Sequence, residues 1–423
     1  MNTDNPGNNS TSNPSNPTNN FTNNILVLNN FSIARVEQHL SQQGNYCLLD
    51  GLLQQHILSY SAYEAWRYGQ IETLDARLGI SNDDLQNLIN KIEQCGKALG
   101  LVNEPYDYFK WAENNQKPLV ASATPAVHRA LTQHWLRAQD VPQLDLFMDN
   151  SAVICENEIH AALAGRQFEL AQKKLQRLIA LNAKHPKLGN YQDLVNYGQH
   201  MQKSALVDAV LLANEITALE QEVLPLASET LGASARDYVA FAWRRLSQSA
   251  QVIAFDSQQT KLHSSYALMQ IPDWTAALGA LTKEPELFVS AILLQRLAIC
   301  HERLQHHNEA MIVWCLLFEC DSNAVEVACE AKVSPRLWAL WEDFWDINDG
   351  GAKSFFPAFV FIKNPGLVHH LDKFPAFTTN SSNAMIDLMK IHIAGGNEID
   401  ARKAVQNISP ALLRLYLNGC AAK

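Results

Sequence analysis

Helix start and stop signals bound most of the apolar runs in this chain, and they constrain its fold more than any other feature. Ser61 and Glu64 have the spacing of a capping box, in which side chains satisfy the free N–H groups of the first helical turn. Ser81 and Asp84 repeat that spacing, and Gly100 follows as a helix stop. After Ser61, apolar side chains recur at helical intervals: Tyr63, Trp66, Ile71, Leu74 and Leu78. Strand-like alternation is nearly absent, so the sequence predicts an all-α fold.

The amino-terminal part of the chain is predicted to contain a flexible tail and a helical domain. Residues 1–24 are rich in Asn, Ser, Thr and Pro, which cannot bury enough apolar surface to offset the entropy of ordering. A tether or an export signal is the alternative interpretation of this tail. Residues 25–150 are predicted to form a helical bundle in which Thr124 and Pro125 start one helix. Glu104–Pro118 is predicted to be an aromatic loop that interrupts the bundle.

Beyond residue 150 the predicted helices are shorter and come in pairs that show a faint internal repeat. The second helix of one pair carries Trp274, Ala277 and Leu281, and that of the next pair carries His307, Ala310, Trp314 and Leu317. The alanines of the two pairs lie 33 residues apart. A small residue is needed where the two helices of a hairpin cross most closely, and a bulky residue one turn later fills the space between neighbouring hairpins.

This pattern resembles the second helix of the tetratricopeptide repeat (TPR) family, in which alanine follows an aromatic residue by three positions and a large apolar residue comes four positions later. A third segment also fits the pattern, through Phe168, Ala171, Leu175 and Leu178, and a weaker match contains Ala401, Val405 and Ile408. In one turn, Pro272 replaces the small residue that the family prefers. The resemblance implies that residues 151–423 form an irregular TPR-like α-solenoid, an array of stacked helical hairpins.

Charge and cysteine usage restrict the expected partners and compartment. The formal net charge is -10 and the sequence pI is about 5.8, so the clustered basic residues that bind phosphate backbones are lacking and no nucleic-acid partner is expected. The eight cysteines have irregular spacings, which is typical of buried thiols in a reducing compartment and predicts a cytoplasmic protein. The sequence contains neither a signal-peptide pattern nor a run long enough to span a bilayer, so no membrane association is expected.

The string CHERLQHH, Cys300–His307, is the most enzyme-like one in the chain. A zinc-hydrolase helix places two histidines four residues apart, so that both imidazoles lie on one face. Here Gln305 occupies the second position, and His306 would lie about 140 degrees from His301 on a continuous helix. We therefore expect no metal site and interpret these histidines as exposed turn residues. The alternative is an enzyme, a metal-dependent one included, whose spatially assembled site uses His301, Glu302 or His307.

The stretch RLWALWEDFWDINDGG is predicted to form one helix that starts at Ser334 and Pro335. Its apolar residues are predicted to form one buried stripe: Leu337, Trp338, Leu340, Trp341, Phe344 and Trp345. Acidic residues occupy the other side of this helix: Glu342, Asp343 and Asp346. From Glu319 to Asp349 the chain has eight acids and two bases. Such a face favours basic partner segments, and the alternative is an ordinary solvated helix face.

These features together predict a non-catalytic scaffold, adaptor or assembly factor that binds a partner protein or peptide, preferably a basic one, on a helical-repeat surface. Glu342, Asp343 and Asp346 are the predicted partner-binding residues. No catalytic residue and no cofactor is predicted, because glycine-rich phosphate loops and nucleophile elbows have no match in the sequence. The alternatives are the enzyme described above and an exported effector that uses the tail. The sequence predicts neither the oligomeric state nor the identity of the partner.

Overall fold

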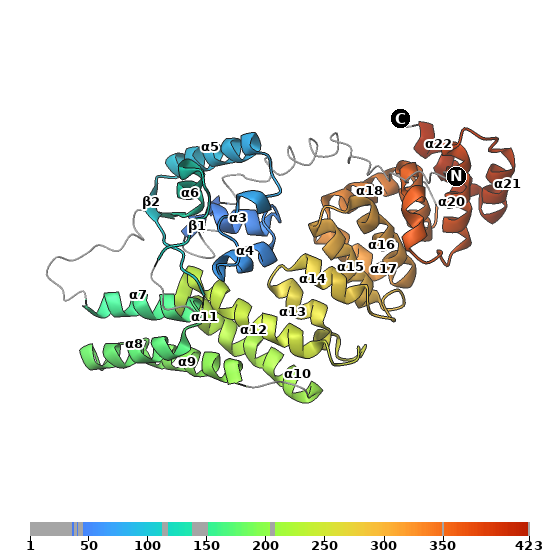
Figure 1. Ribbon diagram of the computed structural model, residues 1–423. Coiled ribbons are helices and arrows are strands. Elements are labelled where there is room, and N and C mark those ends of the chain that lie inside the picture. The colour runs from blue at the N-terminus through green and yellow to red at the C-terminus, as the bar shows by residue number, and fades with distance from the viewer. Residues whose placement is uncertain are drawn as a thin grey trace, which may run out of the picture. The chain divides into compact units, whose positions relative to one another are not determined.

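A computed structural model of the protein describes residues 36–37, 40, 45–111, 117–137, 151–203, 208–348 and 351–421. The tail predicted for residues 1–24 lies outside these ranges. The chain divides into two compact units, Met1–Asn150 and Ser151–Lys423, and each is described by itself. Helices make up most of the described residues (Figure 1), which confirms the all-α class.

The amino-terminal unit combines short helices with a small sheet. Its elements, in chain order, are β1 (Asn45–Cys47), α3 (Leu48–Gln54), α4 (Tyr60–Arg67), the 3-10 turn η1 (Asp75–Arg77), α5 (Asn82–Ala98), β2 (Leu101–Pro105), α6 (Pro125–Leu131) and β3 (Gln133–Arg137). The three strands form an antiparallel sheet in the order β1, β3, β2. The sheet was not predicted, so the description of this unit as a helical bundle is incomplete.

Two glycines in and after α5 let this helix end against the sheet. A Cβ atom on Gly96 would lie 2.4 Å from the ring of Trp135 on β3, so only glycine permits this close approach. Gly100 adopts a left-handed φ of 64° and ends the helix as predicted. At the other end of α5, the N–H of Asp84 donates to Ser81 Oγ at 3.1 Å, which confirms the predicted cap.

Helix α4 differs from its prediction at both ends. It begins two residues early, because Ser59 and not Ser61 is the N-cap and accepts a hydrogen bond from Ala62 N–H at 3.2 Å. It ends at Arg67 and does not continue to Leu78, because Gly69 follows with a left-handed φ of 68°.

The stretch predicted as an aromatic loop belongs in part to the core of this unit. Tyr108 and Trp111 are buried, and both rings lie beside the buried guanidinium of Arg67, at 5.3 and 4.7 Å from its carbon atom. Arg67 also donates hydrogen bonds to Tyr63 Oη at 2.6 Å and to the carbonyl of Phe109 at 3.2 Å. Aromatic faces and these acceptors compensate a buried charge that would otherwise be costly.

Every regular element described in the carboxy-terminal unit is helical. Its α-helices are α7 (Ser151–Ala164), α8 (Phe168–Leu181), α9 (Leu188–Lys203), α10 (Ala209–Ala218), α11 (Leu224–Leu231), α12 (Ala235–Ala250), α13 (Ser264–Gln270), α14 (Trp274–Leu281), α15 (Ala291–Arg303), α16 (His307–Cys320), α17 (Ser322–Glu330), α18 (Pro335–Ile347), α19 (Phe356–Lys363), α20 (Asn380–Ile393), α21 (Ile399–Ile408) and α22 (Pro410–Ala421). Short helical turns join them: η2 (Leu219–Val223), η3 (Gly232–Ser234), η4 (Thr260–Leu262), η5 (Lys353–Phe355) and η6 (Pro365–Lys373).

Each of the four segments with the repeat pattern forms a pair of packed helices. These pairs are α7 with α8, α13 with α14, α15 with α16, and α20 with α21 (Figure 1). Ala171, Ala277 and Ala310 are fully buried in the second helices of the first three pairs, as the pattern predicts. In the first and third of these turns, Arg166 and Gln305 take left-handed φ angles of 61° and 64°, two residues before the second helix begins.

Helix α19 lies at the centre of the last third of the chain. Residues Phe356–Ile362 are all buried, and α16, α18, α20 and α22 pack around the helix. This apolar run is therefore part of the core. Pro357 does not break the helix because it stands in the first turn, where no N–H bond is lost.

Glu319 of α16 ties this region together by holding in place the residues at the start of α20, where Thr379 is the N-cap. Its carboxylate accepts hydrogen bonds from the N–H and hydroxyl of Thr378 at 2.6 and 2.8 Å, and from the hydroxyls of Thr379 and Ser382 at 2.5 and 2.6 Å. Burial acts to raise the pKa of Glu319, but the hydrogen bonds from Ser382, Thr379 and Thr378 outweigh it and hold this pKa below its usual value.

Six of the seven described cysteines are buried, Cys320 is exposed, and all seven are free thiols. None of the described helices combines the length and the apolar character that a membrane crossing requires.

We predict that Glu319→Ala lowers the free energy of unfolding by about 2 kcal/mol, because it removes the anionic acceptor that holds the capping residue Thr379 and leaves several donors without their acceptor. Urea denaturation followed by circular dichroism measures this change. Asp387→Ala on α20 is the control, since Asp387 is exposed and has only a surface ion pair with Lys390. We expect the control to lose less than about 0.5 kcal/mol, and equal losses would refute the role of Glu319 at the start of α20.

Candidate functional site

Helix α18 carries the predicted partner-binding residues, and its start is set by Ser334 and Pro335 as predicted. The N–H of Leu337 donates to Ser334 Oγ at 3.2 Å, and Pro335 occupies the first turn. The helix ends at Ile347, where the N–H of Asn348 bonds back to the carbonyl of Phe344 at 2.8 Å.

The inner face of α18 is a narrow row of three buried residues, Leu337, Trp341 and Phe344. The ring of Trp341 lies 4.8 Å from that of Phe356, and the ring of Phe344 lies 5.5 Å from that of Phe359. Both phenylalanines belong to α19, so this helix determines which side of α18 is covered.

The predicted buried stripe was too wide. Trp338 is only half-buried, and Trp345 is 50% exposed. Trp338 and Trp345 lie about 80 degrees from the buried row on a helical wheel, so the helices that pack on α18 do not cover them fully. The ring of Trp345 meets that of Trp341 edge-on at 5.5 Å and 90°, so it is held in place on one side and open on the other.

The three predicted partner-binding acids, Glu342, Asp343 and Asp346, are all exposed. They are not equivalent, because the Oδ2 atom of Asp343 lies 4.0 Å from Nζ of Lys363. Glu342 and Asp346 form neither a hydrogen bond nor an ion pair with any residue that the structure describes. Two carboxylates on one helix face are therefore without a countercharge from the described chain.

The position of these acids along α18 makes the local electrostatic potential more negative. All three lie in the second half of the helix, and its last turn contains no basic residue. The carboxyl end of a helix carries a partial negative charge, so acids there are unfavourable. Glu342 and Asp346 are also four residues apart, the spacing at which like charges repel by about 0.2 to 0.5 kcal/mol.

Other acids of the same stretch have structural partners. Glu319 accepts the hydroxyl of Ser382 at the start of α20, Asp321 accepts the N–H groups of Asn323 and Ala324 at the start of α17, and Glu326 pairs with Lys353. The acidic surface is consequently smaller than the charge count of the sequence indicates. It is centred on Glu342 and Asp346, and we call these two residues together with Trp338 and Trp345 the α18 face.

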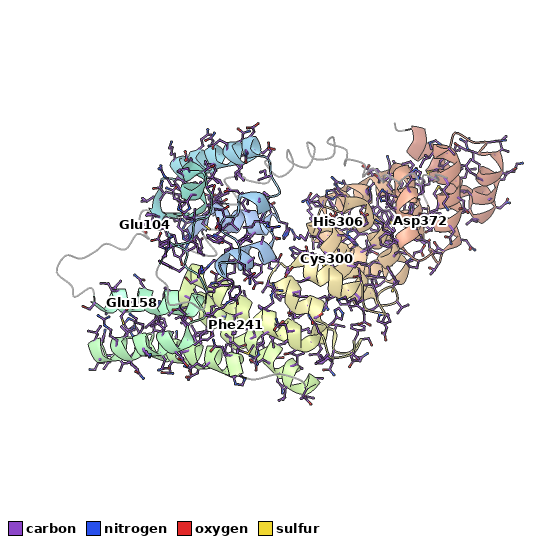
Figure 2. The ribbon with its side chains drawn as sticks, in the orientation of Figure 1. Glu104, Glu158, Phe241, Cys300, His306 and Asp372 are labelled. Atoms are coloured by element: carbon purple, nitrogen blue, oxygen red, sulfur yellow. The ribbon has the colours of Figure 1, made fainter. Side chains whose placement is uncertain are left out.

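The histidine-rich turn between α15 and α16 differs from its prediction. Helix α15 ends at Arg303, and the left-handed Gln305 turns the chain back so that His306 Nδ1 lies 3.3 Å from His301 Nδ1. Figure 2 labels His306 in this turn. The angle of about 140 degrees expected between His301 and His306 on one continuous helix does not apply, because the helix ends between them. His301 is also buried, so its interpretation as an exposed turn residue was wrong.

The structure does not join His301, Glu302 and His307 into one site. Glu302 contacts His307 and not His301. Its carboxylate accepts a hydrogen bond from Trp314 Nε1 at 3.3 Å and lies 3.9 Å from His307 Nδ1. Throughout the described ranges, no three His, Cys, Asp or Glu side chains are grouped so that they could hold a metal ion.

Both histidines of the predicted trio are poor bases in the folded protein. Burial and the neighbouring His306 lower the pKa of His301 to about 4. Burial lowers the pKa of His307 to about 4 as well, with help from Arg336 and His306. Neutral imidazoles at these two positions fit a structural role in the α15–α16 turn.

One arrangement that the sequence analysis missed looks like a hydrolase triad. His263 Nδ1 lies 2.8 Å from Ser265 Oγ, and its Nε2 lies 3.8 Å from a carboxylate oxygen of Glu284. However, Ser265 is completely buried and cannot meet a substrate. His263 Nδ1 also accepts the N–H of Ser265 at 3.3 Å, so its role is to cap α13.

A comparison of the chain with protein-family models, curated proteins and solved structures gives no match.

We predict that the free energy of unfolding falls as the pH is lowered from about 6.5 to about 4. In this range the unfolded chain binds protons at His301 and His307, whose folded pKa values are about 4, while the folded chain does not. The stabilisation is complete above the unfolded pKa and is lost toward the folded pKa, at roughly 1 to 2 kcal/mol per histidine by about pH 5. Urea denaturation at a series of pH values measures this loss.

The double variant His301→Gln and His307→Gln should flatten this pH dependence. The control is His369→Gln, since His369 is exposed in the folded chain. An unchanged pH dependence in the double variant would contradict the assignment.

Proposed function

We propose that the protein is a non-catalytic scaffold or adaptor, and that the α18 face binds a basic segment of a partner protein. The observation that carries this proposal is the pair of exposed carboxylates at Glu342 and Asp346, which have no countercharge among the described residues, beside the half-exposed ring of Trp345. A lysine or arginine of a partner would relieve the repulsion between the acids and the helix end.

An exposed tryptophan beside unpaired acids provides two interactions for the same cation. Carboxylates attract a basic segment from a distance and speed its encounter with the protein. The face of an indole ring then holds an ammonium or guanidinium group, and tryptophan is the best side chain for this contact. Tryptophan is also enriched among the residues that dominate the energy of protein interfaces.

The architecture of the carboxy-terminal unit supports a binding role. Most of its helices pack against their neighbours in the chain, which is the arrangement expected of a TPR-like solenoid. Such arrays present long surfaces to protein or peptide partners without a catalytic pocket. Free and mostly buried thiols fit the cytoplasmic location that forms part of this proposal.

We predict that the double variant Glu342→Lys and Asp346→Lys weakens the binding of a lysine-rich peptide at least tenfold, because it reverses the charge that attracts the peptide. Isothermal titration calorimetry at two salt concentrations measures the affinity, which should decrease with added salt for the wild type. The control is Glu222→Lys with Glu229→Lys, an equal charge change at exposed residues of η2 and α11. Equal losses in both double variants would mean that only the net charge matters, and would overturn the α18 face as the site.

A second prediction separates a binding role from an ordinary solvated helix face. Glu342→Gln removes the repulsion with Asp346 and with the helix end, so it should raise the free energy of unfolding by about 0.5 kcal/mol while it weakens peptide binding. Urea denaturation and calorimetry measure the two effects on one sample. A variant that is destabilised, or that binds the peptide as tightly as the wild type, would argue against the proposal.

A further inference from the structure

The α18 face contains two tryptophan rings on one line along the helix. Trp338 and Trp345 are seven residues apart, which places them about 20 degrees apart on the wheel and about 10 Å apart along the axis. Glu342 lies between them, four residues after the first and three before the second. The face therefore has one carboxylate between two aromatic rings, about one turn from each.

One of the two rings already holds a cation of this chain. The Nζ atom of Lys332 lies 5.1 Å from the centre of the Trp338 ring, within the usual range of a cation–π contact. Lys332 is exposed and stands in the turn between α17 and α18, with a left-handed φ of 51°. It forms no ion pair with any described residue, although acids surround it in sequence. The ring contact is thus the main interaction that positions its ammonium group.

The other ring is open. No cation of the described chain lies over Trp345, although Glu342 and Asp346 stand three residues before and one residue after it on the same helix. The contact between Lys332 and Trp338 shows what kind of group suits a tryptophan on this face.

We propose that the partner segment carries two cationic side chains about 10 Å apart, and that Lys332 is an internal occupant which one of them displaces. The first cation lies over Trp345 between Glu342 and Asp346, and the second takes the place of Lys332 over Trp338. This inference rests on the proposed function of the α18 face.

The displacement is energetically accessible. An exposed cation–π contact contributes about as much as a two- to fivefold change in affinity, so Lys332 competes only weakly. A segment with only one cation places it over Trp345 and has no second cation to displace Lys332 from Trp338, so it gains nothing there. A segment with two cations at the right spacing gains at both rings, so Lys332 makes the face selective for paired cations.

A pair of rigid peptides tests the spacing. Proline-rich peptides form a polyproline II helix, in which residues three apart lie on one side at a distance of about 9 Å. The probe is a proline-rich peptide of about twelve residues with two lysines three positions apart. The comparison peptide has the same composition with the two lysines adjacent, so that they point to different sides. Calorimetry with the full-length protein should show tighter binding of the first peptide by about fivefold or more.

A double-mutant cycle between Lys332 and Trp338 tests the displacement. Lys332→Gln should tighten binding of the probe about two- to fivefold when Trp338 is present, because the ring is then free. In the Trp338→Leu background the same substitution still removes one positive charge, but it frees no ring. It should therefore change the affinity at most about twofold. Circular dichroism confirms that each variant is folded.

The outcomes distinguish this inference from the function on which it rests. If Lys332→Gln has the same effect with and without Trp338, or if the two peptides bind equally, the paired-cation inference is overturned while the basic-partner proposal stands. If neither peptide binds, or if charge reversal at Glu342 and Asp346 leaves binding unchanged, the proposed function itself fails.

Discussion

The buried side chain of Phe344 sets the rotation of α18, and the character of the exposed face depends on that rotation. Phe344 packs against Phe356 and Phe359 of α19, which is itself enclosed by α16, α18, α20 and α22. A rotation of α18 that buried Trp345 would withdraw Phe344 from this contact. Aromatic residues of this size stabilise a core by several kcal/mol when they are fully buried, far more than the repulsion among the acids costs. The core of the unit therefore holds an unfavourable arrangement of charges in place on its surface.

The acids of this region divide into two groups by what their oxygen atoms contact. Glu319 accepts hydrogen bonds from three residues that begin α20, and its lowered pKa follows from them. Glu342 and Asp346 contact no donor among the described residues. Acids of the first group stabilise the fold, whereas those of the second group lower its stability, and we propose that they bind a partner. An acidic residue in this region therefore has a structural role where its oxygen atoms accept hydrogen bonds from the chain, and is a candidate for binding where they do not.

Sequence patterns predicted the parts of the structure that depend on local interactions. Ser81, and Ser334 with Pro335, start helices where expected, because a cap is decided within four residues. Ala277 and Ala310 are buried as their spacing predicts. The sheet was missed because β1 has three residues and leads directly into α3, and such a short strand has no periodicity to detect. The exposure of Trp345 and the meeting of His301 with His306 depend on α19 and on one left-handed turn, which no local pattern encodes.

Fluorine NMR of protein labelled with fluorotryptophan tests the central claim most directly, because the chain contains nine tryptophans and each gives its own resonance. The proline-rich peptide with two lysines three positions apart would be titrated into the full-length protein. We expect the resonances of Trp345 and Trp338 to shift together with the same affinity, while those of the fully buried Trp66 and Trp314 stay unchanged. Saturable shifts confined to other tryptophans, with Trp345 unaffected, would contradict the assignment of the α18 face as the binding site.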